Sequence, residues 1–171
     1  MNVKLEPLNS EDENQFITDN QRAFKYGAEQ YFTLEEMEEQ YEEPGEIISR
    51  KTISRSIHNE GAKTYRIILD DKKVGGIIIN IKGSKGDLDI FFVLPECHSK
   101  GIGQNAWREI EELHPEVKIW ETVTPTFEKR NIHFYVNKLG FNIVEYFNEF
   151  HKDSLYGMDL DEMYKFRKII E

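Results

Sequence analysis

The most informative part of the sequence is residues 93–106, which read Val-Leu-Pro-Glu-Cys-His-Ser-Lys-Gly-Ile-Gly-Gln-Asn-Ala. A β-rich run at 88–94 enters a short loop, and Gly101 and Gly103 then open a segment with helical spacing of apolar residues. Glycine has no Cβ, so the free N–H groups of the first helical turn can approach an anion closely, and the helix dipole favours negative charge there. The stretch therefore predicts a cradle for a phosphate or pyrophosphate group.

The same glycines allow a second interpretation, a dinucleotide-binding fingerprint. Residues 101–106 fit the pattern G-x-G-x-x-A, and Glu121, 20 residues after the first glycine, resembles an acid that binds a ribose. Three features count against it: residues 95–100 separate the strand from the glycines, the preceding strands are joined by hairpins, and Glu121 lies inside a strand instead of at its end. A nicotinamide-dinucleotide site remains an alternative at the level of sequence.

The residues around this stretch predict a mixed arrangement of strands and helices. Runs at 64–69, 74–81 and 88–94 have the alternation of strands, and the short turns between them require antiparallel neighbours. Capping boxes at 10–13 and 33–36 mark the starts of two helices. The remaining predicted elements are a strand at 3–5, helices at 10–26, 33–44, 46–59, 102–113 and 127–139, and strands at 117–123, 142–150 and 163–170.

The composition excludes several classes of protein. The chain has 171 residues, a length typical of a single domain, 1–171, and 39% of them are apolar, enough for a sizeable core. No apolar run approaches a membrane span and the start lacks the apolar core of a secretory signal, so we expect a cytoplasmic protein with no membrane partner. A net charge of −10 disfavours a nucleic-acid partner. The single cysteine, Cys97, excludes an internal disulfide, and the histidine spacing indicates no metal site.

One segment carries most of the negative charge. Between residues 29 and 46 there are eight glutamates and no lysine or arginine. Such a run is typical of a solvated helix face, but it also suits an acidic rim that attracts a cationic substrate. Both interpretations stay open.

Two motifs resemble those of the GNAT superfamily of N-acetyltransferases. The acyl-CoA motif of that family, Arg/Gln-x-x-Gly-x-Gly/Ala, appears here as residues 98–103, His-Ser-Lys-Gly-Ile-Gly, with His98 in place of Arg or Gln. The second motif, a helix that ends in Lys-Leu-Gly-Phe, appears as residues 131–141. The order of the predicted elements agrees with the family over nearly the whole chain.

The resemblance implies a fold and a cosubstrate. The fold class is α/β (α+β), with a mixed, mostly antiparallel central sheet of six to seven strands, helices on both faces, and a splay between the strands at 88–94 and 117–123. Acetyl-CoA would enter the splay with its pyrophosphate on residues 98–104 and its pantetheine arm on the backbone of Phe92 and Val93. The implied CoA-binding residues are Phe92, Val93, His98, Ser99, Lys100, Gly101, Ile102, Gly103, Gln104, Asn131 and Tyr135.

The chemistry of acetyl transfer to an amine selects candidate catalytic residues. The ammonium must lose a proton before it attacks, and the leaving thiolate must gain one. Family members often use a tyrosine as the acid, but the usual position is Val136 here, and Tyr135 lies one residue earlier, about 100° around an α-helix. Tyr135 is therefore either an acid or a packed core residue. Asp87 and Asp89 on one strand, and Glu121 on the next, are candidate bases; we select Asp89 and Glu121.

The predicted function is transfer of an acetyl group from acetyl-CoA to a primary amine by direct attack in a ternary complex. The acceptor is a cationic small molecule or a peptide amine. An alternative is a non-catalytic acyl-CoA-binding module, and covalent transfer through Cys97 is a weaker one. A homodimer is compatible with the resemblance, since aromatic residues near the C-terminus suit either an interface or the core: Phe147, Phe150, Tyr156, Tyr164 and Phe166.

Overall fold

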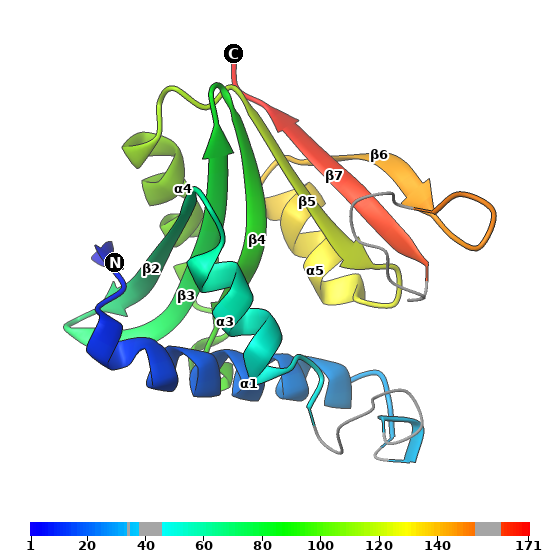
Figure 1. The fold of residues 1–171 in the computed structure, drawn as a ribbon, viewed down its shortest axis with the longest axis horizontal. Coiled ribbons are helices and arrows are strands. Elements are labelled where there is room, and N and C mark those ends of the chain that lie inside the picture. The colour runs from blue at the N-terminus through cyan, green and yellow to red at the C-terminus, as the bar shows by residue number, and fades with distance from the viewer. Residues whose placement is uncertain (34, 38–45, 153–161) are drawn as a thin grey trace.

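A single mixed sheet organises the chain (Figure 1). The structure is a computed structural model that describes residues 1–33, 35–37, 46–152 and 162–171. Within these ranges seven strands pair in the order β1-β2-β3-β4-β5-β7-β6. Their bounds are β1 Val3–Pro7, β2 Ala62–Leu69, β3 Lys72–Lys82, β4 Lys85–Val93, β5 Ile119–Pro125, β6 Asn142–Phe147 and β7 Met163–Ile169. Every pair is antiparallel except β4 with β5, which confirms the predicted mixed, mostly antiparallel sheet.

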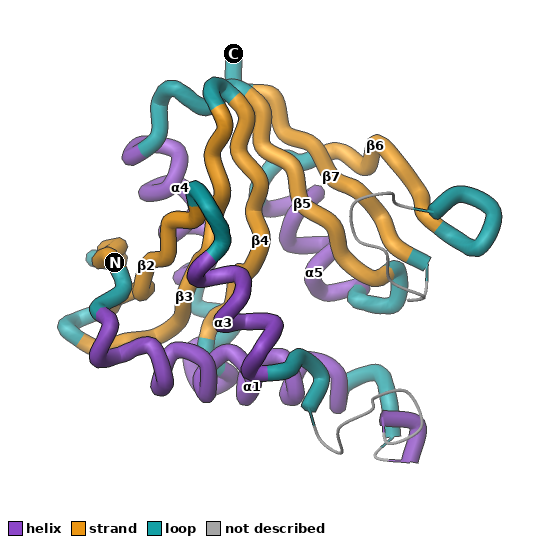
Figure 2. Tube along the Cα trace, in the orientation of Figure 1, coloured by secondary structure: helices purple, strands orange, loops and turns teal. Residues whose placement is uncertain are grey.

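Helices cover both faces of the sheet, as Figure 2 shows. On one face lie α1 (Glu13–Glu29) and α3 (Arg50–His58); on the other lie α4 (Ile102–Leu113) and α5 (Lys129–His133). A π-helical turn, Phe134–Lys138, continues α5, and 3-10 turns cover Ser10–Asp12 and Pro95–Cys97. None of the described helices is long and apolar enough to span a membrane.

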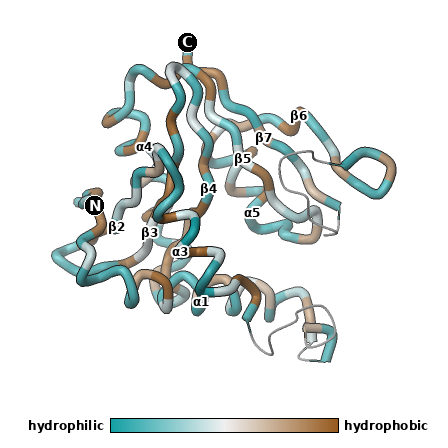
Figure 3. Tube along the Cα trace, viewed as in Figure 1, coloured by the Kyte–Doolittle hydropathy of each residue, from teal (hydrophilic) through white to brown (hydrophobic). Residues whose placement is uncertain are grey.

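Two hydrophobic clusters hold these layers together. Under α4, Trp107 packs edge-on against Trp120 of β5, with ring centroids 5.2 Å apart, and both side chains are buried. Under α1 and α3, Phe16 packs edge-on against Phe92 at 5.2 Å. Figure 3 shows the apolar residues recurring along the strands, as burial on both faces requires. Burial of this aromatic surface fixes the helices to the sheet.

The sheet splits between β4 and β5, as the resemblance implied. The two strands pair only at Lys85–Ile119, Gly86–Trp120 and Asp87–Glu121, and beyond this point they diverge (Figure 1). The close approach at the closed end requires glycine, since a Cβ on Gly86 would lie 2.3 Å from the Trp120 ring. Beside the split, β4 also carries a bulge: Ile78 and Ile79 of β3 pair with Ile90 and Leu88, so Asp89 is the extra residue.

Several predicted boundaries are wrong for local reasons. The helix predicted from residue 46 begins at Arg50, because the Ser49 side chain accepts a hydrogen bond from the Thr52 amide. The first helix is preceded by a 3-10 turn that Asn9, not Ser10, caps through the Glu11 amide.

Two further boundaries differ near the C-terminus. The strand predicted for 142–150 ends at Phe147, because the Asn148 side chain accepts hydrogen bonds from the Phe150 and His151 amides and turns the chain. The helix predicted for 127–139 is a short α-helix followed by the π turn.

The aromatic residues near the C-terminus differ in exposure. Phe166 and Phe147 are buried core residues, whereas Phe150 is 88% exposed; Tyr156 lies outside the described residues.

The capping box at Thr33 is confirmed. The Thr33 amide donates to the Glu36 carboxylate at 2.7 Å, and the Glu36 amide donates to the Thr33 hydroxyl at 3.3 Å. Most of the helix predicted to follow it, and half of the acidic segment, lie outside the described residues.

Candidate active site

The N-terminus of α4 presents backbone donors to a large groove. Gly101, the N-cap, has φ 73°, in the left-handed region that favours glycine, and no side chain forms a capping hydrogen bond there. The first-turn amides of α4 are therefore open to an anion. Gly103 is needed for a second reason: a Cβ there would lie 2.9 Å from Phe134 Cζ, so glycine lets α4 approach the π turn.

The groove, with a volume of about 2580 Å³, brings most of the predicted site residues together. It extends from the α4 N-terminus through the split to the end of β6. Its walls include Asp89 and every predicted CoA-binding residue except one. The exception is Lys100, whose ammonium is turned to the Glu96 carbonyl at 3.3 Å; Glu121 does not line the groove either.

His98 bridges the loop to the end of β4. Its Nε2 donates to the Val93 carbonyl at 2.7 Å, and its ring meets Tyr26 of α1 edge-on at 5.6 Å. Burial lowers the pKa of His98, although the hydrogen bond to Val93 opposes that shift. The imidazole is thus held neutral and fixes the loop against the strand from which the glycine turn begins.

The backbone of β4 alternates between β3 and the split. The Leu94 amide donates to the Val74 carbonyl of β3 at 2.8 Å. Because successive residues of a strand point their backbone groups in opposite directions, Phe92 also turns toward β3, and Phe91 and Val93 turn toward the split. The Phe92 side chain packs on Phe16, away from the divide.

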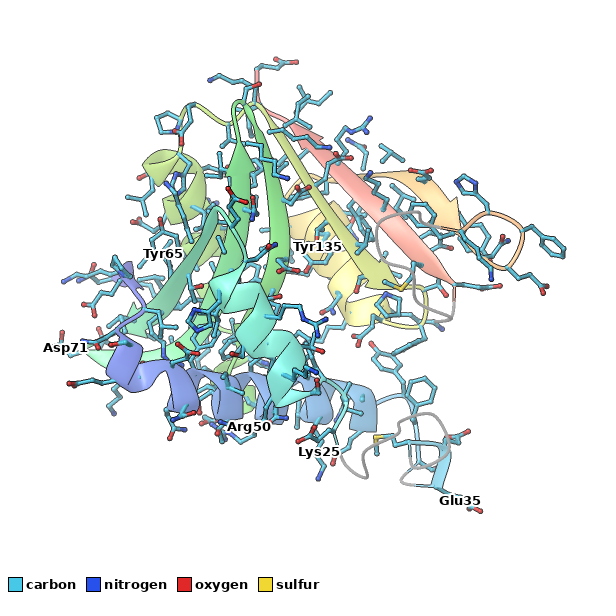
Figure 4. All side chains as sticks on the ribbon, viewed as in Figure 1. Lys25, Glu35, Arg50, Tyr65, Asp71 and Tyr135 are labelled. Carbon is cyan, nitrogen blue, oxygen red and sulfur yellow. The ribbon has the colours of Figure 1, made fainter. Side chains whose placement is uncertain are left out.

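Tyr135, labelled in Figure 4, lies at the split: it hydrogen-bonds with Thr122 of β5, whose hydroxyl donates to the Leu88 carbonyl of β4 at 2.9 Å. The side chain is 8% exposed, and its ring packs against Phe166 at 5.3 Å and Phe141 at 5.9 Å. Burial raises the pKa of Tyr135, against a weaker opposing effect of a hydrogen bond with Thr122 of β5. The phenol is therefore protonated throughout the neutral range.

The π turn accounts for the position of Tyr135 in the sequence. A π turn holds one more residue than an α-helical turn, and such turns recur at functional sites. Here the turn spans Phe134–Lys138, and its closing bond runs from the Leu139 amide to the Phe134 carbonyl at 3.0 Å. The extra residue is absorbed within the turn. Tyr135 thus keeps its direction relative to the start of α5 although Gly140 and Phe141 follow one residue later.

The three candidate bases have different surroundings. Glu121 is 2% exposed and forms ion pairs with Lys85, with Lys165 at 3.3 Å and with Arg167 at 3.0 Å. Burial would raise the pKa of the Glu121 carboxyl, but hydrogen bonds and charge from these three cations outweigh it and lower the pKa to about 2. A carboxylate so strongly ionised is a poor proton acceptor at neutral pH.

The two aspartates of β4 face the groove. Asp89 is exposed at the bulge and accepts a hydrogen bond from the Ser56 hydroxyl of α3 at 2.6 Å. Asp87 is half-buried, and burial raises its pKa, although Lys85 and Lys165 oppose the shift. Cys97 is half-buried between the two hydrophobic clusters.

One acidic residue of the groove was missed by the sequence analysis. Glu128 lies in the turn between β5 and α5, is half-buried and lines the groove. Burial raises its pKa. In the sequence it resembles an ordinary acid at a helix start, and no pattern distinguishes it. Among the described residues, no group of three or more His, Cys, Asp or Glu side chains is arranged to hold a metal ion.

Comparison with known proteins identifies the family. The model of the acetyltransferase (GNAT) family matches residues 21–141, well over half of the chain. The chain belongs to this family. It is therefore an acetyltransferase, and neither the non-catalytic module nor the dinucleotide-binding protein has support. A protein of Bacillus subtilis (strain 168) called YrkN, described as uncharacterized, is 43% identical over 141 residues, which are 75% of this chain and 76% of that protein.

Solved structures of acetyltransferases share the fold. The PaiA N-acetyltransferase of Thermoplasma acidophilum, in complex with coenzyme A, has a TM-score of 0.71 and 19% identity, over 99% of this chain and 100% of that one. The ribosomal-protein-S18-alanine N-acetyltransferase of Escherichia coli has a TM-score of 0.68 and 17% identity, over 99% and 95% of the two chains. At this identity they show the fold alone.

Proposed function

We propose that this acetyltransferase moves the acetyl group of acetyl-CoA to a primary amine by direct attack in a ternary complex. The observation that carries the proposal is the single groove that joins the uncapped N-terminus of α4 to Tyr135 through the split sheet. The α4 N-terminus suits a pyrophosphate, and the split suits an extended pantetheine arm. A CoA thioester placed along both would have its reactive end near the closed end of the split.

The backbone alternation refines the residues that bind CoA. The amides of Gly101, Ile102, Gly103 and Gln104 are the proposed pyrophosphate donors, helped by the His98–Ser99 loop. Phe91 and Val93, not Phe92, are the proposed partners of the pantetheine arm, because their backbone groups face the split. Asn131 lines the same groove one turn before Tyr135. Lys100, which is turned away from the groove, contributes charge near its entrance.

Tyr135 is the proposed acid. Bound acetyl-CoA supplies the thioester, and the thiolate that leaves it needs a proton. The Tyr135 phenol stays protonated at neutral pH and lies where the split closes, so it can donate to the sulfur. Glu121 is better suited to hold Lys85, Lys165 and Arg167 in place than to accept a proton, and Asp89 remains a candidate only for attracting the acceptor.

The acceptor is proposed to be cationic. Among the described residues, seven carboxylates and five lysine or arginine side chains line the groove, and the carboxylates include Glu60, Asp87, Asp89, Glu128 and Glu149. Such a wall raises the local concentration of a cation. A small-molecule amine or a peptide amine would both satisfy this requirement.

The remaining expectations are also proposals. We propose that residues 1–171 act as a single domain, since the seven strands of the described residues join one sheet. We also propose a location in the cytoplasm. A homodimer through the edge strand β6 is favoured by its exposed apolar side chains Ile143, Val144 and Tyr146.

A thermal-shift experiment with acetyl-CoA, free CoA and NADH in parallel tests the proposed cosubstrate. A ligand at 100 times its Kd stabilises a protein by about 2.7 kcal/mol, which moves the midpoint by several degrees. A shift with both CoA species and none with NADH is expected. No shift with CoA would contradict the proposal.

A further inference from the structure

Glu128 is the residue before α5 and lines the same groove as Asn131 and Tyr135. Asn131 and Tyr135 follow it at spacings of three and seven residues, about one and two helical turns. Glu128 follows the end of β5 that has diverged from β4, whereas Tyr135 hydrogen-bonds with Thr122, next to the last paired residues of the two strands. An acceptor that enters from the divergent end would therefore meet Glu128 before it reached the thioester.

The Glu128 side chain does not cap α5, although an acidic side chain at this position usually would. A side chain at a helix start normally accepts a hydrogen bond from one of the first free amides. Here the Arg130 amide instead donates to the Tyr31 hydroxyl, 3.0 Å away at the end of α1, and the Glu128 side chain forms no capping bond. The carboxylate also has no ion-pair or hydrogen-bond partner among the described residues.

Aromatic rings surround the start of α5, next to Glu128. Phe127 precedes Glu128 and packs against Phe32 at 4.6 Å and Tyr31 at 6.1 Å, edge-on in both cases. Phe127 and Tyr31 line the groove. Aromatic faces attract organic cations, and the low polarity that they create strengthens the attraction between an ammonium and a carboxylate.

From this arrangement we infer that Glu128, with Tyr31 and Phe127, forms the subsite for the acceptor's ammonium group, and that Glu128 takes its proton. The inference rests on the proposed function and names a chemical class, a primary amine on an aliphatic chain. The alkyl chain lies against the rings and the ammonium pairs with the carboxylate.

The proton balance is complete. The ammonium gives one proton to the Glu128 carboxylate, and the free amine attacks the thioester carbonyl and forms the C–N bond. The C–S bond breaks, Tyr135 donates to the sulfur, and the second proton of the nitrogen restores the phenol. Glu128 returns its proton to water. The products are the amide, the CoA thiol and one proton.

The surroundings of Glu128 suit this role. Burial raises the pKa of the Glu128 carboxyl, which makes the carboxylate a better proton acceptor. Lys129 and Arg130 follow in sequence but are exposed, and neither contributes to the pKa shift. Tyr31, which follows α1, and Tyr135 of the π turn are the other titratable groups near it, and the charge of Glu128 itself raises the pKa of Tyr135. Glu121, in contrast, is neutralised by three cations.

The test compares Glu128→Gln with Glu112→Gln. Each change removes one carboxylate, but Glu112 is exposed on α4 and does not line the groove. The probe is n-butylamine, whose binding to protein saturated with CoA is followed by NMR, with 1-pentanol as a neutral control. We expect Glu128→Gln to weaken butylammonium binding at least tenfold, and Glu112→Gln and the wild-type protein to bind alike.

Acetyl transfer to the same probe separates proton acceptance from simple attraction. General-base catalysis contributes about 100-fold or more. At neutral pH we expect Glu128→Gln to lose about 100-fold in kcat/KM, and the deficit to shrink as rising pH deprotonates the amine in solution. A deficit confined to KM and independent of pH would overturn the proton-accepting role.

Failure of the inference and failure of the proposed function are distinguishable in the same samples. If acetyl-CoA does not bind the wild-type protein, the proposed function fails. If acetyl-CoA binds, but butylammonium either does not bind or binds equally to Glu128→Gln, the subsite is wrong and the proposed function stands. A thermal midpoint of Glu128→Gln within a few degrees of wild type confirms that the variant is folded.

Discussion

At the scale of single residues, burial separates the carboxylates of this protein into different roles. Glu121 lies near the start of β5 and Glu128 lies just after its end, and both are withdrawn from water to some degree. Glu121 has three cationic partners, whereas Glu128 has none among the described residues. The three cations lower the pKa of Glu121 and keep it ionised. Glu128 has no such partner, so burial raises its pKa.

Replacing Glu121 should destabilise the fold without weakening CoA binding. In Glu121→Gln, Lys85, Lys165 and Arg167 lose their shared carboxylate, and breaking a buried ion pair costs about 3 kcal/mol. Chemical denaturation measures the loss, and calorimetric titration with CoA provides the control. An unchanged free energy of unfolding would contradict the role assigned to this cluster.

The same carboxyl predicts a loss of stability in acid. Its pKa is about 2 in the folded state against 4.5 in the unfolded chain, so the contribution is full above pH 4.5 and is lost as the pH falls toward 2. At about 1.4 kcal/mol per pKa unit the contribution is about 3 kcal/mol. Denaturation curves between pH 6 and pH 3 should show this slope in the wild type and a shallower one in Glu121→Gln.

Removing the phenol of Tyr135 should slow turnover and leave binding intact. In Tyr135→Phe the ring still packs against Phe141 and Phe166, but the proton donor for the sulfur is gone. We expect kcat to fall about 100-fold with little change in the affinity for acetyl-CoA. Equal kcat values for the two proteins would show that Tyr135 is a core residue only.

At the scale of elements, two glycines in helices should respond oppositely to the same substitution. Gly103→Ala places a methyl group 2.9 Å from Phe134 and should push α4 away from the π turn. Overpacking of this kind costs about 1–3 kcal/mol and should also weaken CoA binding. Gly27→Ala in α1 meets nothing within 4 Å and should stabilise the protein by about 0.5–1 kcal/mol.

Thermal denaturation and CoA titration of the two glycine variants measure both effects. If Gly103→Ala binds CoA as the wild type does, the close approach of α4 to the π turn has no part in the site.

The π turn should tolerate removal of its extra residue. Deleting the exposed Asn137 would let the segment close as an α-helix, with Tyr135 and Leu139 still directed inward. We expect the variant to fold and to retain activity within about tenfold, because general-acid catalysis depends on the direction of the phenol. Circular dichroism and the acetyl-transfer assay check this, and an unfolded protein would contradict the account of Tyr135.

At the scale of the whole molecule, the sequence predicted the features that depend on residues close together in the chain. The glycine turn at 101–103, the hairpins and the order of strands follow from local patterns, and the resemblance supplied the split sheet. The partners of Glu121 could not be predicted, because Lys85 and Arg167 come from strands distant in sequence. Glu128 was missed for the same reason. The Arg130 amide, which Glu128 could otherwise cap, donates to the hydroxyl of Tyr31, 99 residues away in the sequence.

The sequence shows that Tyr135 lies one residue before the usual tyrosine position, but it does not show which way the side chain points. One residue too many before Gly140 predicts a tyrosine turned by about 100° if the helix is regular. The turn at 134–138 removes that rotation locally, and periodicity cannot reveal such a turn.

The most direct test of the central claim is steady-state release of the CoA thiol from acetyl-CoA with n-butylamine, together with mass spectrometry of the amine product. The account predicts thiol release that depends on both substrates, one acetylated amine for each thiol, and a loss of about 100-fold in Glu128→Gln. Binding of acetyl-CoA without any amine-dependent thiol release would contradict it.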